Sequence, residues 1–430
     1  MMKYVIMGQL AGIGGWQLYI DARATYISNK GYDVYLVSIC NEKDIRLPRF
    51  SNSKHLCIPE VHMPPASYMK KQQEHVLRRI YAFIGNDDGE MTIESTDMSL
   101  SMWGEKIAEH YNARNYSYLL HSHFPQQNRY VQDFFLFKYK RNELAGMSEL
   151  TLPELFHNHP DAGEIEPRSL PATPKDPITD ENYLEAETKK TEQYKREKDA
   201  FVIGYFGNLD KPHFVQLCDF IVEYAKANRQ QEFLFISIGS SGKNNAEKKQ
   251  KHMEKLIKNC KVLNIPSIYP VPRQIFQSMD VCLASWGSAD NSARAGALTI
   301  RLLDDVTIIP QGILGITVKD YKSPRTMESL TELFDKIRNG EYRRENARID
   351  SKPYDYTIAH KQIDEAVFNI THSKEYYDIS NIKTVSKRSR IEKKMNTIFG
   401  VGLTKGIMCV MKKVLSKPYA KMQRKESYAK

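Results

Sequence analysis

The chain is poor in cysteine and has no long hydrophobic run. Its six cysteines among 430 residues include no Cys-x-x-Cys pair, which predicts reduced thiols and argues against a disulfide framework or a metal cluster. No apolar run reaches the length of about 18 residues that spans a bilayer. The apolar stretch Met1–Met7 reaches Gly8 too soon for a secretory signal. We therefore expect a cytoplasmic protein without membrane-spanning segments.

Acidic residues are scarce at one end of the chain. Residues 383–430 hold 14 Lys/Arg and 2 Asp/Glu, which is a charge of +12. The whole chain has a net charge of +10, so residues 1–382 together carry −2. A nucleic-acid-binding fold needs a basic body, so nucleic acid is not expected as a partner. Apolar residues recur at helical spacing over 399–414, with lysines opposite them. This pattern favours a basic amphipathic helix on the anionic inner face of the cell membrane; the alternative is a last helix packed on the protein.

The length and the apolar pattern predict two α/β domains. At 430 residues the chain exceeds what one core usually holds, about 250–300 residues. β-branched apolar runs alternate with amphipathic stretches from 3–8 onward and again from 201–207, which predicts parallel sheets covered by helices. Five prolines between 160 and 177 interrupt the pattern. The expected divisions are an N-terminal domain 1–165, a proline-rich charged linker 166–200, a C-terminal domain 201–355, a possible return helix 356–382 and the basic tail 383–430.

The dinucleotide-binding pattern Gly-x-Gly-x-x-Gly is also missing. Gly8, Gly12, Gly14 and Gly15 follow the first expected strand with a different spacing, and no acidic residue is well placed after the second strand. A nicotinamide-dependent oxidoreductase is therefore disfavoured. Glycines at a strand-to-helix turn still let the backbone approach a phosphate, although they also serve as a plain tight turn.

The most informative segment runs from Ser285 to Asp305. It is the end of a strand followed by small residues and an expected helix over 289–298. Small side chains let backbone N–H groups come close to a ligand, and a helix N-terminus carries roughly half a positive charge. The segment therefore predicts a diphosphate site, in which Asp290 receives ribose hydroxyls or, alternatively, only caps the helix.

Histidines mark two further places. His121 and His123 follow an expected central strand, where side chains of an open α/β sheet line the crevice, and purely structural histidines are the alternative. His157 and His159 precede Asp161, but a zinc site there lacks a third well-spaced ligand. We expect a loop between domains at the second pair.

Three segments in order resemble the family-4 glycosyltransferases of GT-B fold. The pair Gly14-Gly15, followed by the strand start at 29–34, resembles the beginning of the family's first domain. Residues 203–209 resemble the start of its second domain, and residues 271–285 resemble the strand that leads to its donor site. The resemblance covers roughly residues 3–40 and 201–318. It implies two Rossmann-like domains facing across a cleft, with a nucleotide sugar on the C-terminal domain, the acceptor on the N-terminal one and no metal cofactor.

The resemblance also implies roles for single residues. His123 takes the place of a histidine beside the reacting sugar, with His121 as its neighbour. Front-face attack by the acceptor hydroxyl, with retention of configuration, needs no carboxylate nucleophile. The main departures are Trp286 and Arg294, which stand where the family has two glutamates.

A second departure concerns the cations that meet the donor diphosphate. Asn208 and His213 stand where the family has two basic residues. Lys211, together with Arg294 at the start of the expected helix, is the compensating pair, since an arginine grips a phosphate with two hydrogen bonds.

The sequence therefore predicts a glycosyltransferase that moves a sugar from a nucleotide sugar to a growing glycan or lipid-linked acceptor, in surface polysaccharide synthesis at the membrane. One alternative is a nucleotide-sugar 2-epimerase, which needs cleft carboxylates that we cannot place. Another is a catalytically degenerate GT-B subunit that serves as a membrane-associated scaffold. The predicted site residues are His123 and His121 for catalysis, and Gly14, Gly15, Gly207, Asn208, Lys211, Ser285, Gly287, Ser288, Asp290, Ser292 and Arg294 for the donor.

Overall fold

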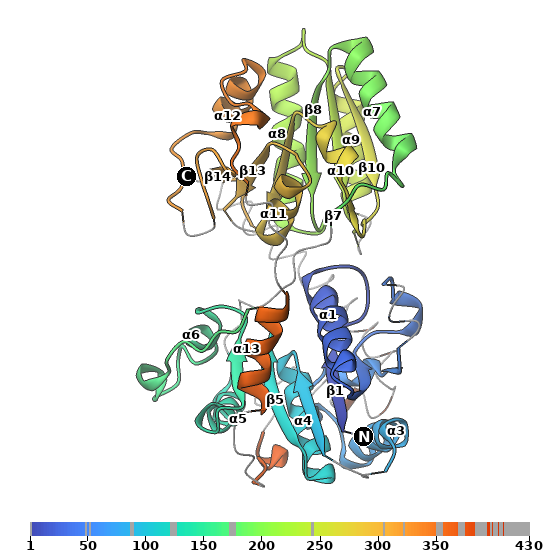
Figure 1. Ribbon diagram of the computed structural model, residues 1–430, viewed down its shortest axis with the longest axis vertical. Helices are drawn as coiled ribbons and strands as arrows, with labels where there is room; N and C mark the ends of the chain where they lie inside the picture. Colours follow the sequence, from blue (N-terminus) through green and yellow to red (C-terminus); the bar gives the residue numbers. More distant parts are fainter. Residues whose placement is uncertain are drawn as a thin grey trace. The chain divides into compact units, whose positions relative to one another are not determined.

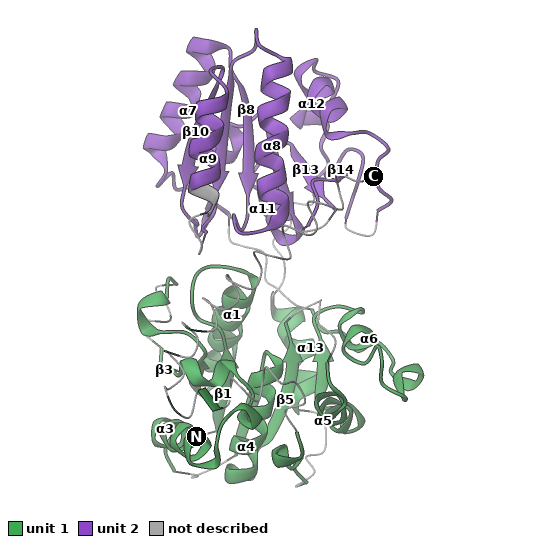
Figure 2. Ribbon diagram, turned by 180° about the vertical axis from the view of Figure 1, so that it is seen from behind, with its two compact units in different colours: residues 1–174, 355–430 green, residues 175–354 purple. Residues whose placement is uncertain are grey.

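The computed structural model divides into two compact units, which Figure 2 shows in green and purple. The first comprises residues 1–174 and 355–430, and the second comprises residues 175–354. The described residues are 2–47, 50, 53–86, 90–120, 127–171, 178–241, 245–303, 306–320, 323–349, 356–368, 375–382 and the single positions 394, 395, 398, 403 and 407.

The first unit is built on a six-stranded parallel sheet (Figure 1). Its strand order, β3-β2-β1-β4-β5-β6, is the doubly wound order in which the chain starts in the middle and reverses direction beside its first strand. The elements are β1 (Lys3–Gly8), α1 (Gly15–Asn29), β2 (Asp33–Ser38), η1 (Glu42–Asp44), β3 (His55–Cys57), η2 (Pro59–His62), η3 (Pro65–Ser67), α3 (Lys70–Ile84), β4 (Met91–Ser95), α4 (Met98–Tyr111), β5 (Arg114–Leu119), α5 (Arg129–Lys140), β6 (Leu144–Gly146), α6 (Thr151–Leu155) and η4 (Ala162–Glu164).

The second unit repeats this order as β10-β9-β8-β12-β13-β14, with β14 antiparallel to β13. α8, α9 and α12 contribute to the core on one face, and α7, α10 and α11 to the core on the other. The elements are β7 (Ile178–Thr179), α7 (Glu185–Lys198), β8 (Phe201–Phe206), α8 (Pro212–Ala227), β9 (Phe233–Ile238), α9 (Asn245–Leu256), β10 (Cys260–Ile265), β11 (Val271–Pro272), α10 (Arg273–Gln277), β12 (Val281–Ser285), α11 (Trp286–Arg294), β13 (Thr299–Leu302), β14 (Pro310–Ile313), α12 (Leu330–Arg338) and η5 (Arg344–Asn346).

The chain then returns to the first unit as α13 (Tyr356–Phe368) and η6 (Ile379–Asn381). α13 lies along α1, where Asp364 forms a 2.7 Å ion pair with the fully buried Arg23. Arg23 also pairs at 3.0 Å with Glu94 of β4, which is itself fully buried. A buried charge is tolerated only when it is paired and hydrogen-bonded, so this network fixes the return helix to the sheet.

The division between the units differs from the expected linker at 166–200. β7 pairs with β11 of the second unit, and α7 contributes Tyr194 to that unit's core. The charged composition of α7 concealed this contact, because only one narrow side of the helix, with Thr188 and Thr191, is buried. The boundary therefore falls between residues 174 and 175.

Among the described residues, no helix combines the length and the apolar character needed to cross a membrane. The amphipathic helix expected over 399–414 lies outside the described residues, apart from positions 403 and 407. Its membrane role stays a prediction.

Candidate functional site

The carboxyl ends of β8 and β12 are neighbours at the point where the strand order of the second unit reverses. Tyr205 of β8 pairs with Leu283 of β12. Gly207 and Ser285 each follow two residues later, just after β8 and at the end of β12, so both lie at the carboxyl edge of the sheet. Doubly wound sheets bind ligands in the crevice at this switch point. The structure thus brings together two motifs that lie about 80 positions apart in the sequence.

Two helices begin at this edge, one on each face of the sheet. Lys211 is the N-cap residue of α8, and Ser285 is the N-cap residue of α11. Neither side chain forms a capping hydrogen bond with its helix. The first N–H groups of a helix have no acceptor within it, and they carry roughly half a positive charge. Two positive helix ends with a lysine between strand and helix suit a diphosphate.

The backbone at this edge is packed closely on one side and open on the other. A Cβ on Gly239, which follows β9, would lie 1.9 Å from the carbonyl oxygen of Gly207, so only glycine fits. The Gly207 N–H donates to the carbonyl of Ile238 at 3.0 Å. A Cβ on Gly287 of α11, in contrast, would meet nothing within 4 Å. Gly287 is therefore where a ligand's phosphates have room to approach the backbone.

Trp286 is a functional candidate that the sequence reasoning noted only as a departure. It has φ of 50° at the turn from β12 to α11, and 44% of the residue is exposed. A bulky residue in the left-handed region costs about 1–3 kcal/mol and persists where the surrounding structure enforces it, often at functional sites. An exposed ring at this carboxyl edge offers a stacking surface for a base or sugar.

Two predicted donor residues do not fit, because α11 spans 286–294 and not 289–298. Arg294 is the last residue of the helix, about 12 Å along the axis from its start at 1.5 Å per residue, so it does not grip a phosphate at the N-terminus. The side chain of Ser292 is fully buried, and its hydroxyl contacts the Ala289 carbonyl and the Thr299 hydroxyl, both at 3.0 Å. Ser292 fixes α11 to β13.

Three other residues of the donor motifs, Asp290, Asn208 and His213, form local contacts within the second unit. Asp290 lies 3.5 Å from the guanidinium of Arg301, a buried arginine of β13 that the sequence reasoning missed and that interrupts an apolar strand. The side-chain oxygen of Asn208 accepts the N–H of Asp210 at 2.8 Å and shapes the loop after β8. His213 is fully buried and contacts the Tyr205 hydroxyl at 2.7 Å, so its ring is not accessible to a ligand. Lys211 precedes the first residue of α8, and Arg301 contacts Asp290 of α11.

The first unit has its own switch point, between β1 and β4, where Met7 pairs with Ser95. Gly14 is the extended N-cap residue of α1, and Gly15 begins that helix. The indole N–H of Trp16 donates to the Thr96 hydroxyl at 2.7 Å, which ties the first turn of α1 to the end of β4. The predicted catalytic residues His121 and His123 lie outside the described residues, and their roles stay predictions.

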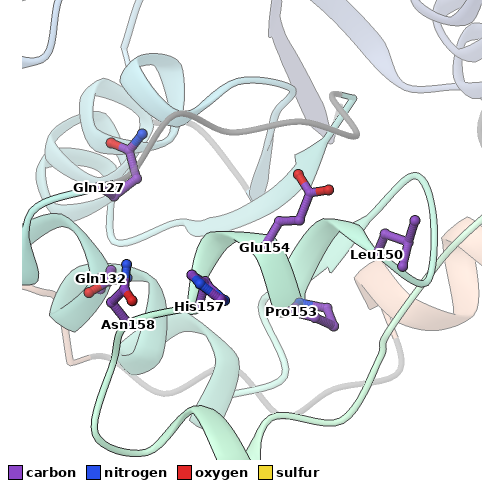
Figure 3. A pocket seen from close by; sticks show the side chains of 7 residues that line it. All are labelled: Gln127, Gln132, Leu150, Pro153, Glu154, His157 and Asn158. Atoms are coloured by element: carbon purple, nitrogen blue, oxygen red, sulfur yellow. The ribbon is translucent and has the colours of Figure 1, made fainter. Parts of the chain in front are cut away.

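A pocket of about 350 Å³ lies in the first unit beside α6 (Figure 3). The Gln132 side chain of α5 donates to the Leu155 carbonyl at 3.0 Å and joins α5 to α6. Amide, carboxylate and imidazole groups beside apolar surface are suited to sugar hydroxyls and ring faces. The lining residues are Gln127, Gln132, Leu150, Pro153, Glu154, His157 and Asn158.

The two histidines near this pocket do not converge on one point. His157 lines the pocket, whereas the buried ring of His159 contacts the Asp133 carboxylate at 3.2 Å and accepts the Asp161 N–H at 3.1 Å. Both ring nitrogens of His159 are therefore used locally. This arrangement gives no support to zinc binding at this pair.

With the geometry established, known structures define the class of fold. HepE from Anabaena in complex with UDP-glucose superimposes with a TM-score of 0.59 at 12% identity, over 86% of this chain and 100% of that one. The lipopolysaccharide outer core galactosyltransferase WaaB gives 0.50 at 15% over 86% and 99%. A glycosyltransferase from Rickettsia africae gives 0.53 at 12% over 91% and 98%. The chain therefore has the α/β architecture of two Rossmann-like units that characterises the GT-B fold.

No protein-family sequence profile matches the chain, and no curated protein matches it by sequence. The likeness is therefore one of fold, and membership of glycosyltransferase family 4 stays a prediction from the sequence motifs.

Proposed function

We propose that this chain is a glycosyltransferase that takes a sugar from a nucleoside diphosphate sugar. The observation that carries the proposal is the second unit's switch point, where β8 ends just before Gly207, the neighbouring strand β12 ends at Ser285, and two uncapped helices begin. The fold is shared with HepE, which was crystallised with UDP-glucose. The acceptor is a growing glycan or a lipid-linked sugar, and the basic tail 383–430 holds the enzyme at the membrane where surface polysaccharide is made.

The transfer follows from the charge at this edge. The acceptor hydroxyl attacks the anomeric carbon, the bond from that carbon to the diphosphate oxygen breaks, and the hydroxyl proton leaves with the diphosphate. Negative charge then grows on the diphosphate, where the N–H groups of Gly287 and Ser288 and the Lys211 ammonium stabilise it. Attack on the face that the diphosphate leaves retains the configuration and uses no carboxylate nucleophile. Because fixed dipoles and a lysine supply the charge, we propose that the transfer proceeds without added Mg²⁺ or Mn²⁺.

The pocket beside α6 is our candidate for the acceptor subsite. His157 and Asn158 line it and are exposed, so their replacement by alanine leaves the core intact. We expect the paired substitution to raise KM for the acceptor and to leave donor affinity unchanged. An unchanged acceptor KM would place the acceptor elsewhere.

The first experiment is a thermal-unfolding screen with UDP, GDP, ADP and CMP. A nucleotide at about 100 times its Kd stabilises a protein by about 2.7 kcal/mol, which raises the Tm of a unit of this size by roughly 5–10 °C. The nucleotide that binds then selects the sugar donors for a product assay, in which NMR of the new anomeric proton reports retention.

A degenerate subunit without donor binding is the second candidate, and one observation favours it. Trp286 and Arg294 occupy the places where the resembled family has glutamates, so this chain offers no carboxylate at either. Absence of a Tm shift with all four nucleotides would select this candidate over the enzyme.

A further inference from the structure

Outside the proposed nucleotide site, three potential metal ligands gather at the carboxyl edge of the first sheet, and a fourth residue, Cys40, contacts one of them. Glu42, His55 and Cys57 each place a ligand atom within 4.8 Å of those of the other two, and the Sγ of Cys40 lies 3.5 Å from that of Cys57. The topology explains this meeting, because β2 and β3 are parallel neighbours whose carboxyl ends coincide. His55 and Cys57, two residues apart on β3, share one face of the strand.

The ring of His55 is held in the orientation of a metal ligand. Its Nδ1 lies 2.9 Å from the Ser53 carbonyl, which can only accept, so Nδ1 carries a proton. Its Nε2 lies 2.5 Å from Oε1 of Glu42. Two lone pairs at that distance repel each other, so a cation belongs between them: a second proton or a metal ion. A histidine that donates its other N–H to a backbone carbonyl is the usual second-shell arrangement at zinc sites.

The sulfur atoms also fit a metal better than a disulfide. Two thiolates on one tetrahedral zinc, each with a bond of about 2.3 Å, lie roughly 3.8 Å apart, whereas a disulfide bond is about 2.05 Å long. The observed separation is 3.5 Å. Glu42 has to move about 0.8 Å from the imidazole to share a tetrahedral site, and its side chain is 70% exposed and therefore able to do so.

We propose that Cys40, Glu42, His55 and Cys57 form a structural zinc site. Two thiolates, one imidazole and one carboxylate are a donor set that favours Zn²⁺ over the harder divalent ions. The Ser38 hydroxyl donates to the Cys40 sulfur at 3.1 Å and supplies a further outer contact. The inference does not depend on the proposed function.

The site would stabilise the glycine turn of the first unit. The Gly12 N–H donates to the carbonyl of Asp44 at 3.0 Å, and Ala11 forms a bridge with Ile45. These contacts connect η1, which contains Glu42, to the loop that leads into Gly14. Zinc held by Glu42 and Cys40 therefore fixes the backbone at the start of α1.

The test is metal binding by the full chain, purified anaerobically and stripped with a chelator. We expect one Zn²⁺ per chain after reconstitution, and a Co²⁺ titration with an intense thiolate-to-metal charge-transfer band. H55Q and C57S should each lower Zn²⁺ affinity by at least about 100-fold, since even second-shell changes cost 10–100-fold. H252Q removes an exposed histidine of the other unit and should bind as the intact protein does.

Three results would overturn the proposal. They are a Co²⁺ spectrum without the charge-transfer band, equal Zn²⁺ affinity in H55Q and H252Q, and a Cys40–Cys57 disulfide in the anaerobically purified chain. E42Q covers the case in which C57S does not fold, because Glu42 is on the surface. In the intact chain, removal of zinc should also speed amide exchange at Ala11 and Gly12, and unchanged exchange would contradict the coupling to the glycine turn.

Discussion

Replacing Gly287 by alanine should stabilise the fold and weaken donor binding at the same time. Gly287 is the second residue of α11, and a Cβ there would meet no atom within 4 Å. Alanine is favoured over glycine in a helix by about 0.5–1 kcal/mol. For a unit of this size, 1 kcal/mol corresponds to a Tm increase of about 2–4 °C.

Donor binding should change in the opposite direction. The added methyl group occupies the open space at the start of α11. It therefore prevents a phosphate from reaching the N–H groups in the first turn of this helix. Each hydrogen bond to a charged group contributes about 1.5–3 kcal/mol, so loss of one should weaken the nucleotide found in the screen by roughly 10- to 100-fold. Isothermal titration calorimetry gives the Kd, and thermal unfolding gives the Tm of the same sample.

Gly163→Ala is the matched control. A Cβ on Gly163 also meets nothing within 4 Å, but this residue lies in η4 of the first unit, an element that contains no predicted donor residue. We expect it to leave nucleotide affinity unchanged. If Gly287→Ala binds the nucleotide as tightly as the control does, the diphosphate does not rest on the start of α11, and the site assignment is wrong.

Three further predictions concern stability and localisation. Glu94→Gln should destabilise the first unit by about 3–5 kcal/mol in urea unfolding, because it removes one partner of a buried ion pair with Arg23. Glu223→Gln, on the surface, is the control and should cost less than about 1 kcal/mol. An equally small loss for Glu94→Gln would contradict the role of the Arg23 ion pairs in stability. Burial and the nearby Arg23 charge lower the pKa of His360 from 6.5 to about 4, so the unfolded chain binds the extra proton and stability should fall by about 3 kcal/mol from pH 6.5 to pH 4. His360→Phe should flatten that part of the pH profile, and an unchanged slope would assign it to other groups. Deletion of 383–430 should abolish cosedimentation with anionic vesicles and leave nucleotide affinity intact, whereas continued sedimentation would place the membrane contact in the body of the protein.

The sheets could be predicted from the sequence because their signals are local. The run Phe201–Phe206 is apolar and bounded by Gly207, and in the structure it is the central strand β8. Strand identity and chain order then fix the carboxyl edge of the sheet, where Gly207 and Ser285 both lie. Their role in donor binding stays a prediction. The limits of α11 were harder to predict, since the helix begins with Trp286 in a left-handed conformation that a bulky residue rarely adopts.

The cluster of Cys40, Glu42, His55 and Cys57 was not predictable from spacing. Cys40 and Cys57 are 17 positions apart, and the motif rules for cysteine look for pairs with two residues between them. Only the parallel pairing of β2 with β3 brings them within 3.5 Å. The prediction of reduced thiols agrees with the second unit, where Cys218 and Cys282 are free and burial raises the pKa of both to about 12 and leaves them unreactive.

The difference between local and non-local signals also matters for the donor motif, in which Trp286 and Arg294 replace two glutamates. Comparison of motifs places Trp286 and Arg294 where glutamates are expected, and by itself this indicates a lost site. The structure instead has an uncapped helix start at Trp286, an Asp290 carboxylate held by Arg301 from a neighbouring strand, and open space over Gly287. Strain at Trp286 costs free energy in the isolated chain, and a vestigial site has no reason to retain it. A Trp286→Ala variant that keeps its Tm but loses nucleotide affinity would show that the ring serves the ligand, whereas unchanged affinity would show that the ring takes no part in nucleotide binding.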